Sequence, residues 1–490
     1  MYDGVLLQGF HWYLPNDGKH WSWLEEQASS LASKGITAIW LPPASKAWGS
    51  NSSVGYDGFD FWDLGRYRAH NNPKRTKHGS MADLQALIGQ LHTHGIQAYA
   101  DLVFNHKMGG EEEQWACVKQ VDLNDSNHTI KGWERKKIST GYRFKQRMQE
   151  QNTGGTPTDS RFEWNWDHFD AYTEGDGHSR KRYVIKDKDF SCAPMIHHGN
   201  QPFLMGAELD TMHPDVVAEL DRIGDWLVDT VGFDGFRIDA IKHIRASFFP
   251  DYLHRLRQRK SKSLFTVGEY WEDHELGKLT GFLDATDGAL SLFDFRLRQR
   301  FWEAADAGRD YPLHTIFHDT LTHVWPTKSV TFVDNHDLQP HRDARDFCRV
   351  KHDWFKPLAY ALILLRPQGY PCIFAGDYFD SDFYRSGVEP RHGWMIDRFL
   401  EARKHLVGYP FDRFDHPNCI GWIAQGNANH KAVAVVMSNA DDGWKDLPTR
   451  TGCGPFTDIT QHISDAIHPN DGGETRFTCA GGKVSVWVEQ

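Results

Sequence analysis

The chain has 490 residues, of which 40% are hydrophobic and 25% charged, and its formal net charge is −11 with histidine neutral. This length and composition are typical of a globular protein with several domains or one large barrel with insertions, and they exclude a mini-protein and a disordered chain. The negative net charge disfavours nucleic acid as a partner.

Signals for membranes, disulfides and targeting are few. No apolar run of about 18 residues is present, so we expect no membrane span. The seven cysteines are an odd number without a C-x-x-C pair, so they indicate neither a disulfide framework nor a zinc motif. The chain starts at Met1 without an apolar leader, which leaves two compartments open: the cytoplasm if Met1 is the natural start, or the exterior if a leader has been removed.

Eight short β-rich apolar runs alternate with amphipathic helical segments. The runs are 5–10, 36–41, 97–103, 233–239, 264–269, 289–295, 329–333 and 370–374. The clearest helix follows Ser80 as its cap, and a second begins at Pro214. Eight β/α units predict an α/β fold whose parallel strands close into a (β/α)8 TIM barrel. An open doubly wound sheet is the rival, but it needs a Gly-rich phosphate turn after an early strand, and the sequence has none.

The alternation breaks twice. The segment after Asn105 has no sustained helical period and carries many charges and turn residues, which predicts a small β-rich domain inserted after the third strand. Beyond residue 408, short alternating segments indicate an antiparallel β-sandwich. We therefore expect a barrel over 1–105 and 209–408, an inserted domain over 106–208 and a C-terminal domain over 409–490. The basic run 131–147 is expected on a solvated face rather than in a polyanion site.

Carboxylates stand at the carboxyl ends of three predicted barrel strands: Asp239 on the fourth, Glu269 on the fifth and Asp337 on the seventh. Since these ends meet at one rim of a barrel, the three groups converge on one cavity. One such aspartate alone can simply cap a helix, but burying three costs several kcal/mol without compensation. Arg237 lies on the same strand face as Asp239 and can keep it ionised. An ionised nucleophile beside an acid with a raised pKa is typical of glycoside hydrolysis.

Histidines and a tyrosine adjoin the same strand ends. His106, His243 and His336 can donate hydrogen bonds to substrate hydroxyls or pack as core residues. A transition-metal site is the rival reading, but no H-x-H or H-E-x-x-H spacing favours it. Tyr56, after the second strand, can stack on a sugar ring or pack in the core.

Four segments stand in order at these strand ends: DLVFNH at 101–106, GFRIDAIKH at 235–243, GEYW at 268–271 and FVDNHD at 332–337. Together they resemble the four signature regions of the alpha-amylase family of glycoside hydrolases. The opening LLQGFHWYLPNDGKHW, the stretch 41–60 and HPDVVAEL from His213 extend the likeness towards the liquefying bacterial amylases and their intracellular relatives. The likeness covers the barrel and the insertion well and the C-terminal domain weakly.

The resemblance implies roles for individual residues. Asp239 would be the nucleophile, Glu269 the general acid/base, and Asp337 the third carboxylate, which holds ring hydroxyls and stabilises the transition state. Further residues would bind the substrate: Tyr56, His106, Arg237 and His336 at the cleaved bond, and Lys242, His243 and Trp271 on the leaving-group side. A retaining enzyme needs its two reacting carboxyls about 5 Å apart, which adjacent strands can provide.

The family usually holds calcium between the barrel and the insertion, and here the sequence departs from the pattern. Asn105 and His243 match expected ligands, and Glu208 and Asp210 are further candidates, but expected aspartates fall on Ser191, Pro202 and Glu208. Calcium prefers six to eight oxygen ligands. We therefore expect no required cofactor, with packing or a side chain near Glu208 and Asp210 in the place of the ion.

The sequence thus predicts an endo-acting retaining alpha-amylase that cleaves internal α-1,4-glucosidic bonds of starch, amylose and maltooligosaccharides, with no nucleic-acid or membrane partner and as a monomer. An exo-acting maltooligosaccharide-forming amylase or a 4-α-glucanotransferase is the alternative, because water and sugar acceptors compete for one intermediate. A non-catalytic glucan-binding barrel would be expected to lack one of the three carboxylates.

Overall fold

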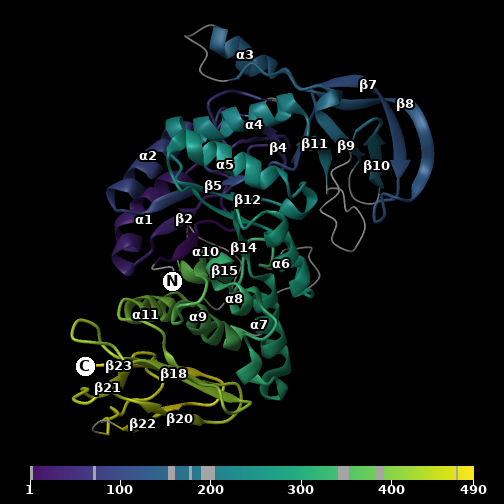
Figure 1. Ribbon diagram of the computed structural model, residues 1–490. Helices are drawn as coiled ribbons and strands as arrows, with labels where there is room; N and C mark the ends of the chain where they lie inside the picture. The colour runs from purple at the N-terminus through teal and green to yellow at the C-terminus, as the bar shows by residue number, and fades with distance from the viewer. Residues whose placement is uncertain are drawn as a thin grey trace.

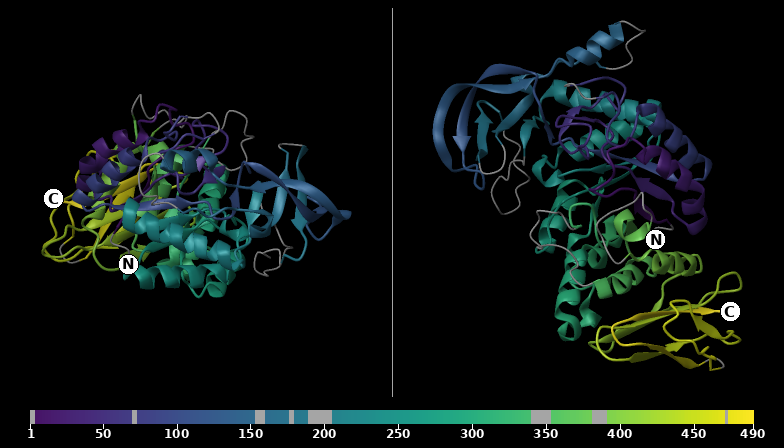
Figure 2. Two further views of the ribbon diagram at one scale, coloured as in Figure 1. Left: turned by 90° about the horizontal axis from the view of Figure 1, so that it is seen from above. Right: turned by 180° about the vertical axis from the view of Figure 1, so that it is seen from behind.

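The computed structural model describes residues 4–69, 73–152, 160–175, 179–188, 205–339, 353–380, 391–470 and 473–490. A barrel lies between an inserted β domain, at the upper right of Figure 1, and a C-terminal β domain, at its lower end. Figure 2 shows the same arrangement from above and from behind. Among these residues, no helix combines the length and the apolar composition that crossing a bilayer requires.

Eight parallel strands close into the predicted barrel, in the order β1-β16-β15-β14-β13-β12-β5-β2. The first strand completes the ring, because Leu6 lies opposite Ala38 on one side and Cys372 on the other. All eight strands fall within the apolar runs read from the sequence, so the (β/α)8 prediction is confirmed. They are β1 (Leu6–Gln8), β2 (Ala38–Trp40), β5 (Gln97–Leu102), β12 (Gly235–Ile238), β13 (Phe265–Gly268), β14 (Ser291–Phe293), β15 (Ser329–Phe332) and β16 (Tyr370–Phe374).

Helices cover the outside of the barrel (Figure 1). Ser80 caps α2 as predicted: its hydroxyl accepts from the Asp83 N–H (3.2 Å), and the Asp83 carboxylate accepts from the Ser80 N–H (2.9 Å). The second predicted helix, α4, begins at Pro214 as expected. The helices of the barrel are α1 (His20–Lys34), α2 (Met81–Thr93), α4 (Pro214–Trp226), α5 (Phe248–Lys260), α6 (Leu276–Ala285), α7 (Phe295–Ala307), α8 (Leu321–Val324), α9 (Lys356–Leu364), α10 (Ala375–Tyr378) and α11 (Gly393–Arg403).

The insertion after β5 forms a six-stranded sheet with the order β6-β11-β9-β10-β7-β8. Its first and last strands pair where the chain leaves and re-enters the barrel, with Ala207 opposite Lys107. One short helix, α3 (Lys145–Asn152), is present where the sequence shows no helical period; eight residues are too few to display one. The strands are β6 (His106–Lys107), β7 (Glu112–Val121), β8 (Thr129–Gly141), β9 (Phe169–Glu174), β10 (Lys181–Ile185) and β11 (Gly206–Leu209).

The basic run 131–147 is not solvated throughout, contrary to the sequence reading. Lys131, Arg135 and Lys137 are exposed on β8, but Arg147 is only 3% exposed. Its Nε lies 2.7 Å from Asp60 Oδ2, at the end of the hairpin formed by β3 (Lys46–Ala47) and β4 (Gly58–Asp60). Burial of this arginine is possible because a buried carboxylate pairs with it.

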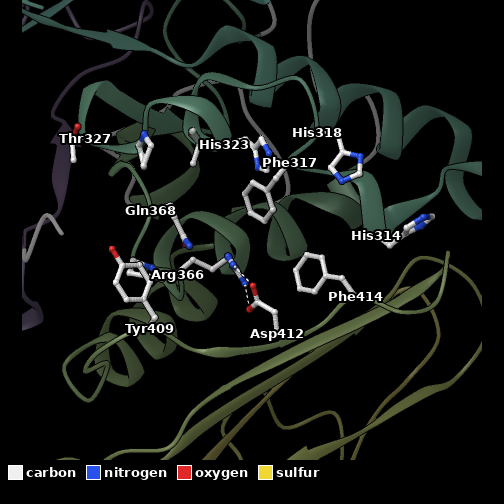
Figure 3. Close-up of a pocket in the computed structure, with 13 residues that line it drawn as sticks. His314, Phe317, His318, His323, Thr327, Arg366, Gln368, Tyr409, Asp412 and Phe414 are labelled. Carbon is white, nitrogen blue, oxygen red and sulfur yellow. Dashed lines mark hydrogen bonds and ion pairs between the residues drawn. The ribbon is translucent and has the colours of Figure 1, made fainter.

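The C-terminal region forms two antiparallel sheets that share a buried cluster, as the sequence predicts. Phe477 on β22 packs its ring against Phe456 (5.0 Å between centroids) and Trp487 (6.3 Å) on the other sheet. A pocket lies where this region meets the barrel (Figure 3). The strands are β17 (Phe411–Arg413), β18 (Cys419–Ala424), β19 (Val433–Ser438), β21 (Phe456–Asp458) and β23 (Val484–Glu489) in one sheet, and β20 (Gly443–Pro448) and β22 (Glu474–Cys479) in the other.

Candidate active site

One guanidinium joins carboxylates from three neighbouring barrel strands. Arg237 on β12 is 1% exposed, and its Nη1 lies 2.8 Å from both Asp239 Oδ1 and Asp101 Oδ1. Its Nη2 lies 2.9 Å from Glu269 Oε2, directly after β13. Asp239 and Glu269 therefore contact the same planar group and face the same cavity at the carboxyl rim of the barrel.

The charges of this cluster are unbalanced. Burial raises the pKa of Asp239 well above its ordinary range; Arg237 opposes this rise, while Glu269 and Asp101 add to it. Burial and the charge of Glu269 raise the pKa of Asp337 to about 7. One cation faces several acids, which raises the pKa of Asp239, whereas the sequence predicts that Arg237 keeps Asp239 ionised. The contact with Arg237 favours ionisation of Asp239.

Asp101 is a central residue of the site that the sequence reading left without a role. Its carboxylate accepts hydrogen bonds from the Tyr56 hydroxyl (2.8 Å), the Trp40 Nε1–H (3.0 Å) and Arg237 (2.8 Å). It thereby fixes both Tyr56 and Arg237. A signal for it exists: if adjacent parallel strands β5 and β12 pair in register, Asp101 lies directly opposite Arg237, as it does in the structure.

Three flat rings form a wall beside the carboxylates. The rings of Tyr56 and His336 are 5.0 Å apart with an interplanar angle of 6°, and Trp12 is nearly parallel to both. His336 is held by Gln8, whose Nε2 lies 3.0 Å from its Nδ1. Tyr56 is half-buried: it packs against the core and lies beside Asp101 and His336. Trp12 was missed because nothing in its sequence neighbourhood marks it apart from other aromatics.

His106 contacts the backbone of Tyr56. Its Nε2 lies 2.9 Å from the Tyr56 carbonyl oxygen, and the side chain is 3% exposed. Burial lowers the pKa of His106 to about 4, so the ring is neutral at physiological pH. A neutral ring that donates to the Tyr56 carbonyl fixes the position of Tyr56.

The residues assigned to the leaving-group side cluster after β12 and β13. The Lys242 ammonium donates to the Trp271 carbonyl (3.2 Å), and the Trp271 ring stacks on Phe295 at 5.1 Å. His243 ends the short 3-10 helix η4 (Ile241–His243) and is 5% exposed. Ala240, before this turn, has a left-handed backbone (φ 49°), and its N–H donates to Glu269 Oε2 at 3.3 Å.

Two of the calcium candidates, Asp210 and Glu208, lie near cationic side chains. Asp210 Oδ2 lies 3.3 Å from the Lys188 ammonium, which also contacts Asp167 Oδ1 at 2.9 Å. Glu208 is 1% exposed; burial lowers the pKa of Arg182, and the negative charge of Glu208 opposes this decrease. Asn105 is buried and supplies a neutral amide oxygen. Positions 191 and 202 lie outside the described residues.

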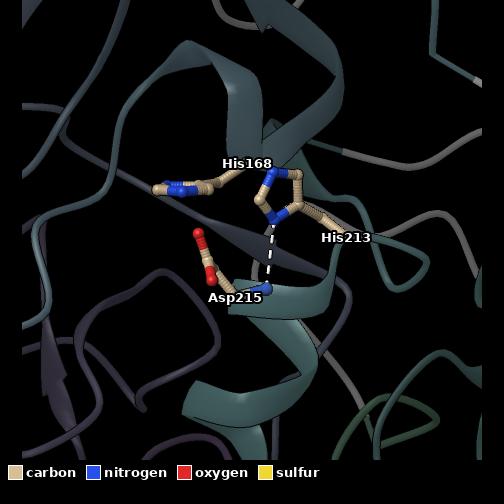
Figure 4. Close-up of side chains that lie close together, drawn as sticks. All are labelled: His168, His213 and Asp215. Atoms are coloured by element: carbon tan, nitrogen blue, oxygen red, sulfur yellow. Dashed lines mark hydrogen bonds between the residues drawn. The ribbon is translucent and has the colours of Figure 1, made fainter.

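His168, His213 and Asp215 also lie close together, at the start of α4 (Figure 4). The Nδ1 of His213 accepts from the Asp215 N–H (3.2 Å), and the Nδ1 of His168 accepts from the Asn165 N–H (3.1 Å). A neutral imidazole that accepts at Nδ1 carries its proton on Nε2. Neither Nε2 therefore offers a lone pair to a metal in this arrangement: the His213 ring caps α4, and the His168 ring accepts from Asn165 at the start of the 3-10 helix η1 (Trp166–His168).

The chain is similar in sequence to known proteins. The family model "Alpha amylase, catalytic domain" matches residues 24–175. A glucan 1,4-alpha-maltohexaosidase from Bacillus sp. (strain 707) is 38% identical over 502 residues, which cover 100% of this chain and 93% of that protein. An alpha-amylase from Bacillus licheniformis is 37% identical (100% and 94%), and a cytoplasmic alpha-amylase from Escherichia coli (strain K12) is 34% identical (100% and 99%).

A solved structure supports the fold. An alpha-amylase from Geobacillus thermoleovorans, complexed with acarbose, matches with a TM-score of 0.65 at 15% identity, over 99% of this chain and 98% of that one. The three relatives described above are 34–38% identical and cover 100% of this chain. The chain therefore belongs to the alpha-amylase family of glycoside hydrolases.

Proposed function

We propose that the protein is an endo-acting, retaining alpha-amylase that hydrolyses internal α-1,4-glucosidic bonds of starch, amylose and maltooligosaccharides. The observation that carries this proposal is that Asp239 and Glu269 contact the same guanidinium, at 2.8 and 2.9 Å. Two carboxyls held side by side on adjacent strands suit the short spacing of a retaining mechanism.

Each carboxyl has one task in each step. Glu269 gives its proton to the glycosidic oxygen while Asp239 attacks the anomeric carbon, so the C–O bond breaks and a glycosyl ester forms. Water then attacks the same carbon and gives a proton back to Glu269, and Asp239 leaves as a carboxylate. Asp337 would bind ring hydroxyls and stabilise the positive charge that develops on the sugar.

The wall of rings would place the sugar. Tyr56 and Trp12 offer flat apolar faces to the CH groups of a glucose ring, and Asp101 holds the tyrosine through its hydroxyl. Lys242 and Trp271 would line the leaving-group side, where their mutual hydrogen bond fixes the loop after β13.

The test is substitution of the two reacting groups. Asp239→Asn and Glu269→Gln should each lower kcat on soluble starch by several orders of magnitude, with unchanged circular dichroism. Proton NMR of the first products should show the α-anomer, because two inversions retain the configuration. A β-anomer would contradict retention, and near-wild-type turnover in either variant would contradict the assignment.

The alternative is an exo-acting amylase that releases oligosaccharides of fixed length, which is favoured by one relative whose name is maltohexaosidase. The early product profile on amylose separates the two. A broad range of lengths with a fast loss of iodine colour supports the endo mode; a single short product from the first minutes supports the exo mode. Longer chains formed from maltooligosaccharides would instead indicate a glucanotransferase.

We also propose that activity needs no calcium. The Lys188 ammonium lies between Asp167 and Asp210, where it supplies positive charge from the chain itself. A chelator should leave the rate on soluble starch unchanged. Loss of activity in chelator that calcium alone restores would refute this proposal.

A further inference from the structure

Two cysteines of the C-terminal region come together inside its β-sandwich, although their spacing in the sequence indicates no disulfide framework. Cys419 is the first residue of β18, in the five-stranded sheet, and Cys479 is the last residue of β22, in the two-stranded sheet (Figure 1). They are 7% and 2% exposed and belong to the same buried cluster. The two thiols therefore reach one apolar cluster from different sheets.

A glycine leaves the space that the two sulfur atoms occupy. Gly443 on β20 lies directly opposite Cys479 in the two-stranded sheet. A Cβ atom at position 443 would lie 2.6 Å from the Cys419 sulfur and 3.4 Å from the Cys479 sulfur. The first distance is too short for non-bonded atoms, so a side chain at this position would displace the Cys419 sulfur. Both sulfur atoms therefore lie against the same backbone position.

The two thiols also contact each other. The Cys479 thiol donates a hydrogen bond to the Cys419 sulfur, and the Cys419 thiol lies 3.7 Å from the Trp444 carbonyl oxygen. Cysteines can form a disulfide only where their backbones already lie close enough for the sulfur atoms to meet. This pair fulfils that condition in the folded protein.

The surroundings make the two thiols unequal. The hydrogen bond from Cys479 lowers the pKa of Cys419; burial opposes this decrease, and the positive charge of Lys445 adds to it. The same hydrogen bond, together with burial, raises the pKa of Cys479. Since the thiolate is the reactive form of cysteine, Cys419 is the first of the two to react, and it is also the more exposed.

We propose that Cys419 and Cys479 form a disulfide that joins the two sheets of the C-terminal region, with a low-molecular-weight disulfide such as oxidised glutathione as the oxidant. The Cys419 thiolate attacks one sulfur of that molecule and displaces a small thiolate, which leaves a mixed disulfide. Cys479 then loses its proton to water, attacks the Cys419 sulfur and displaces the second small thiolate. The protein gives up two protons and two electrons, and the small disulfide is reduced to two thiols.

The bond would strengthen the C-terminal region without touching the reacting groups. It closes the chain from 419 to 479 into a loop that contains β19, β20 and β21. Such a cross-link restricts the unfolded chain, so the oxidised protein should resist heat better than the reduced protein. The bond is favoured in an oxidising compartment and stays open in a reducing one. Turnover below the unfolding temperature should be the same in both states, because Asp239 and Glu269 lie on the barrel.

The experiment keeps native protein overnight in oxidised or in reduced glutathione, and refolds a second portion from urea in the same two solutions. Peptide mapping without reductant should find the peptides of Cys419 and Cys479 linked in the oxidised portions, with two hydrogen atoms fewer than the separate peptides. The unfolding temperature of the oxidised wild type should exceed that of the reduced wild type by roughly 5–10 °C.

Serine variants test the pairing. Cys419→Ser and Cys479→Ser should each lose the temperature difference between the oxidised and reduced states. Cys453→Ser is the matched control and should keep it, because Cys453 lies in the same region, is half-buried and donates to Glu489 instead. Each variant is compared with its own reduced form, so a lower stability of a serine variant does not affect the comparison.

Three results overturn the inference: no linked peptide in either oxidised portion of the wild type, an oxidation-dependent rise in Cys419→Ser equal to that of the wild type, or Cys453 as the main partner of either cysteine. A linked peptide in the refolded portion alone supports the pairing and shows that burial limits the access of glutathione to the folded protein.

Discussion

Asp337 is expected to cost folding stability at neutral pH, and replacing it with asparagine should reveal that cost. Burial and Glu269 raise the pKa of Asp337 to about 7, whereas an aspartate in an unfolded chain titrates near 3.9. Between these values the folded protein binds the proton more tightly than the unfolded chain does. The free energy of unfolding contributed by this group therefore falls as the pH rises from 4 to 7, and stays at its low value above 7.

The magnitude follows from the same values. A full shift from about 3.9 to about 7 corresponds to an upper limit of ~4 kcal/mol. The Asp337 side chain is 34% exposed, so water screens part of the interaction. We expect Asp337→Asn to raise the free energy of unfolding by about 1–2 kcal/mol at pH 8 and by nothing at pH 4.

The assay is urea unfolding of the wild type and of Asp337→Asn at both pH values, with Asp284→Asn on the exposed side of α6 as the control. Turnover of Asp337→Asn on starch should fall strongly in the same preparation, because the proposed mechanism uses the carboxylate. Equal stability changes at pH 4 and pH 8, or a destabilised variant at pH 8, would refute the electrostatic reasoning.

Three further outcomes test other parts of the structure. Lys356→Met should lower the free energy of unfolding by about 3–5 kcal/mol, because it leaves Asp334 and Asp377 buried without their cation; a loss under 1 kcal/mol would contradict this. Asp101→Asn should lower kcat roughly 10²-fold and leave KM unchanged, because Tyr56 and Arg237 lose the carboxylate that positions them. An unchanged kcat would show that Asp101 is dispensable. Lys188→Gln should lower the unfolding temperature, and calcium should restore it only if the ion can replace the ammonium.

Much of the fold could be predicted from the sequence because barrel strands are short, apolar and regularly spaced. Helix faces were less predictable. On α4, Glu219 is buried, although a glutamate reads as solvent-facing, because Trp62 Nε1 (2.8 Å) and Ser160 Oγ (3.0 Å) donate to it from distant segments. The spacing of apolar residues along a helix reports only on neighbours within that helix, so it does not predict partners from distant segments of the chain.

The candidate site, like the fold, could be predicted only in part from the sequence. The positions of Asp239 and Glu269 could be predicted, since each directly follows a strand whose end is fixed by topology. The role of Asp101 follows only if the in-register pairing of β5 and β12 is assumed, which places it opposite Arg237. The role of Trp40 could not be predicted, because it comes from a contact across strands, where the Trp40 Nε1–H donates to Asp101. The protonation of the cluster also depends on the number of acids that share one guanidinium, which spacing alone does not give.

The way the ring of strands closes has a consequence for biosynthesis. β1 pairs with β2 early, but its other edge must wait for β16, where Leu6 meets Cys372. At ribosomal rates of ~5–20 residues per second, that interval is on the order of 20–70 s. Throughout it, the nascent chain carries an open sheet edge that can pair with a neighbouring chain. Newly made copies are thus most vulnerable to aggregation before their last barrel strand emerges, and slower initiation or chaperone supply should raise the yield of active enzyme.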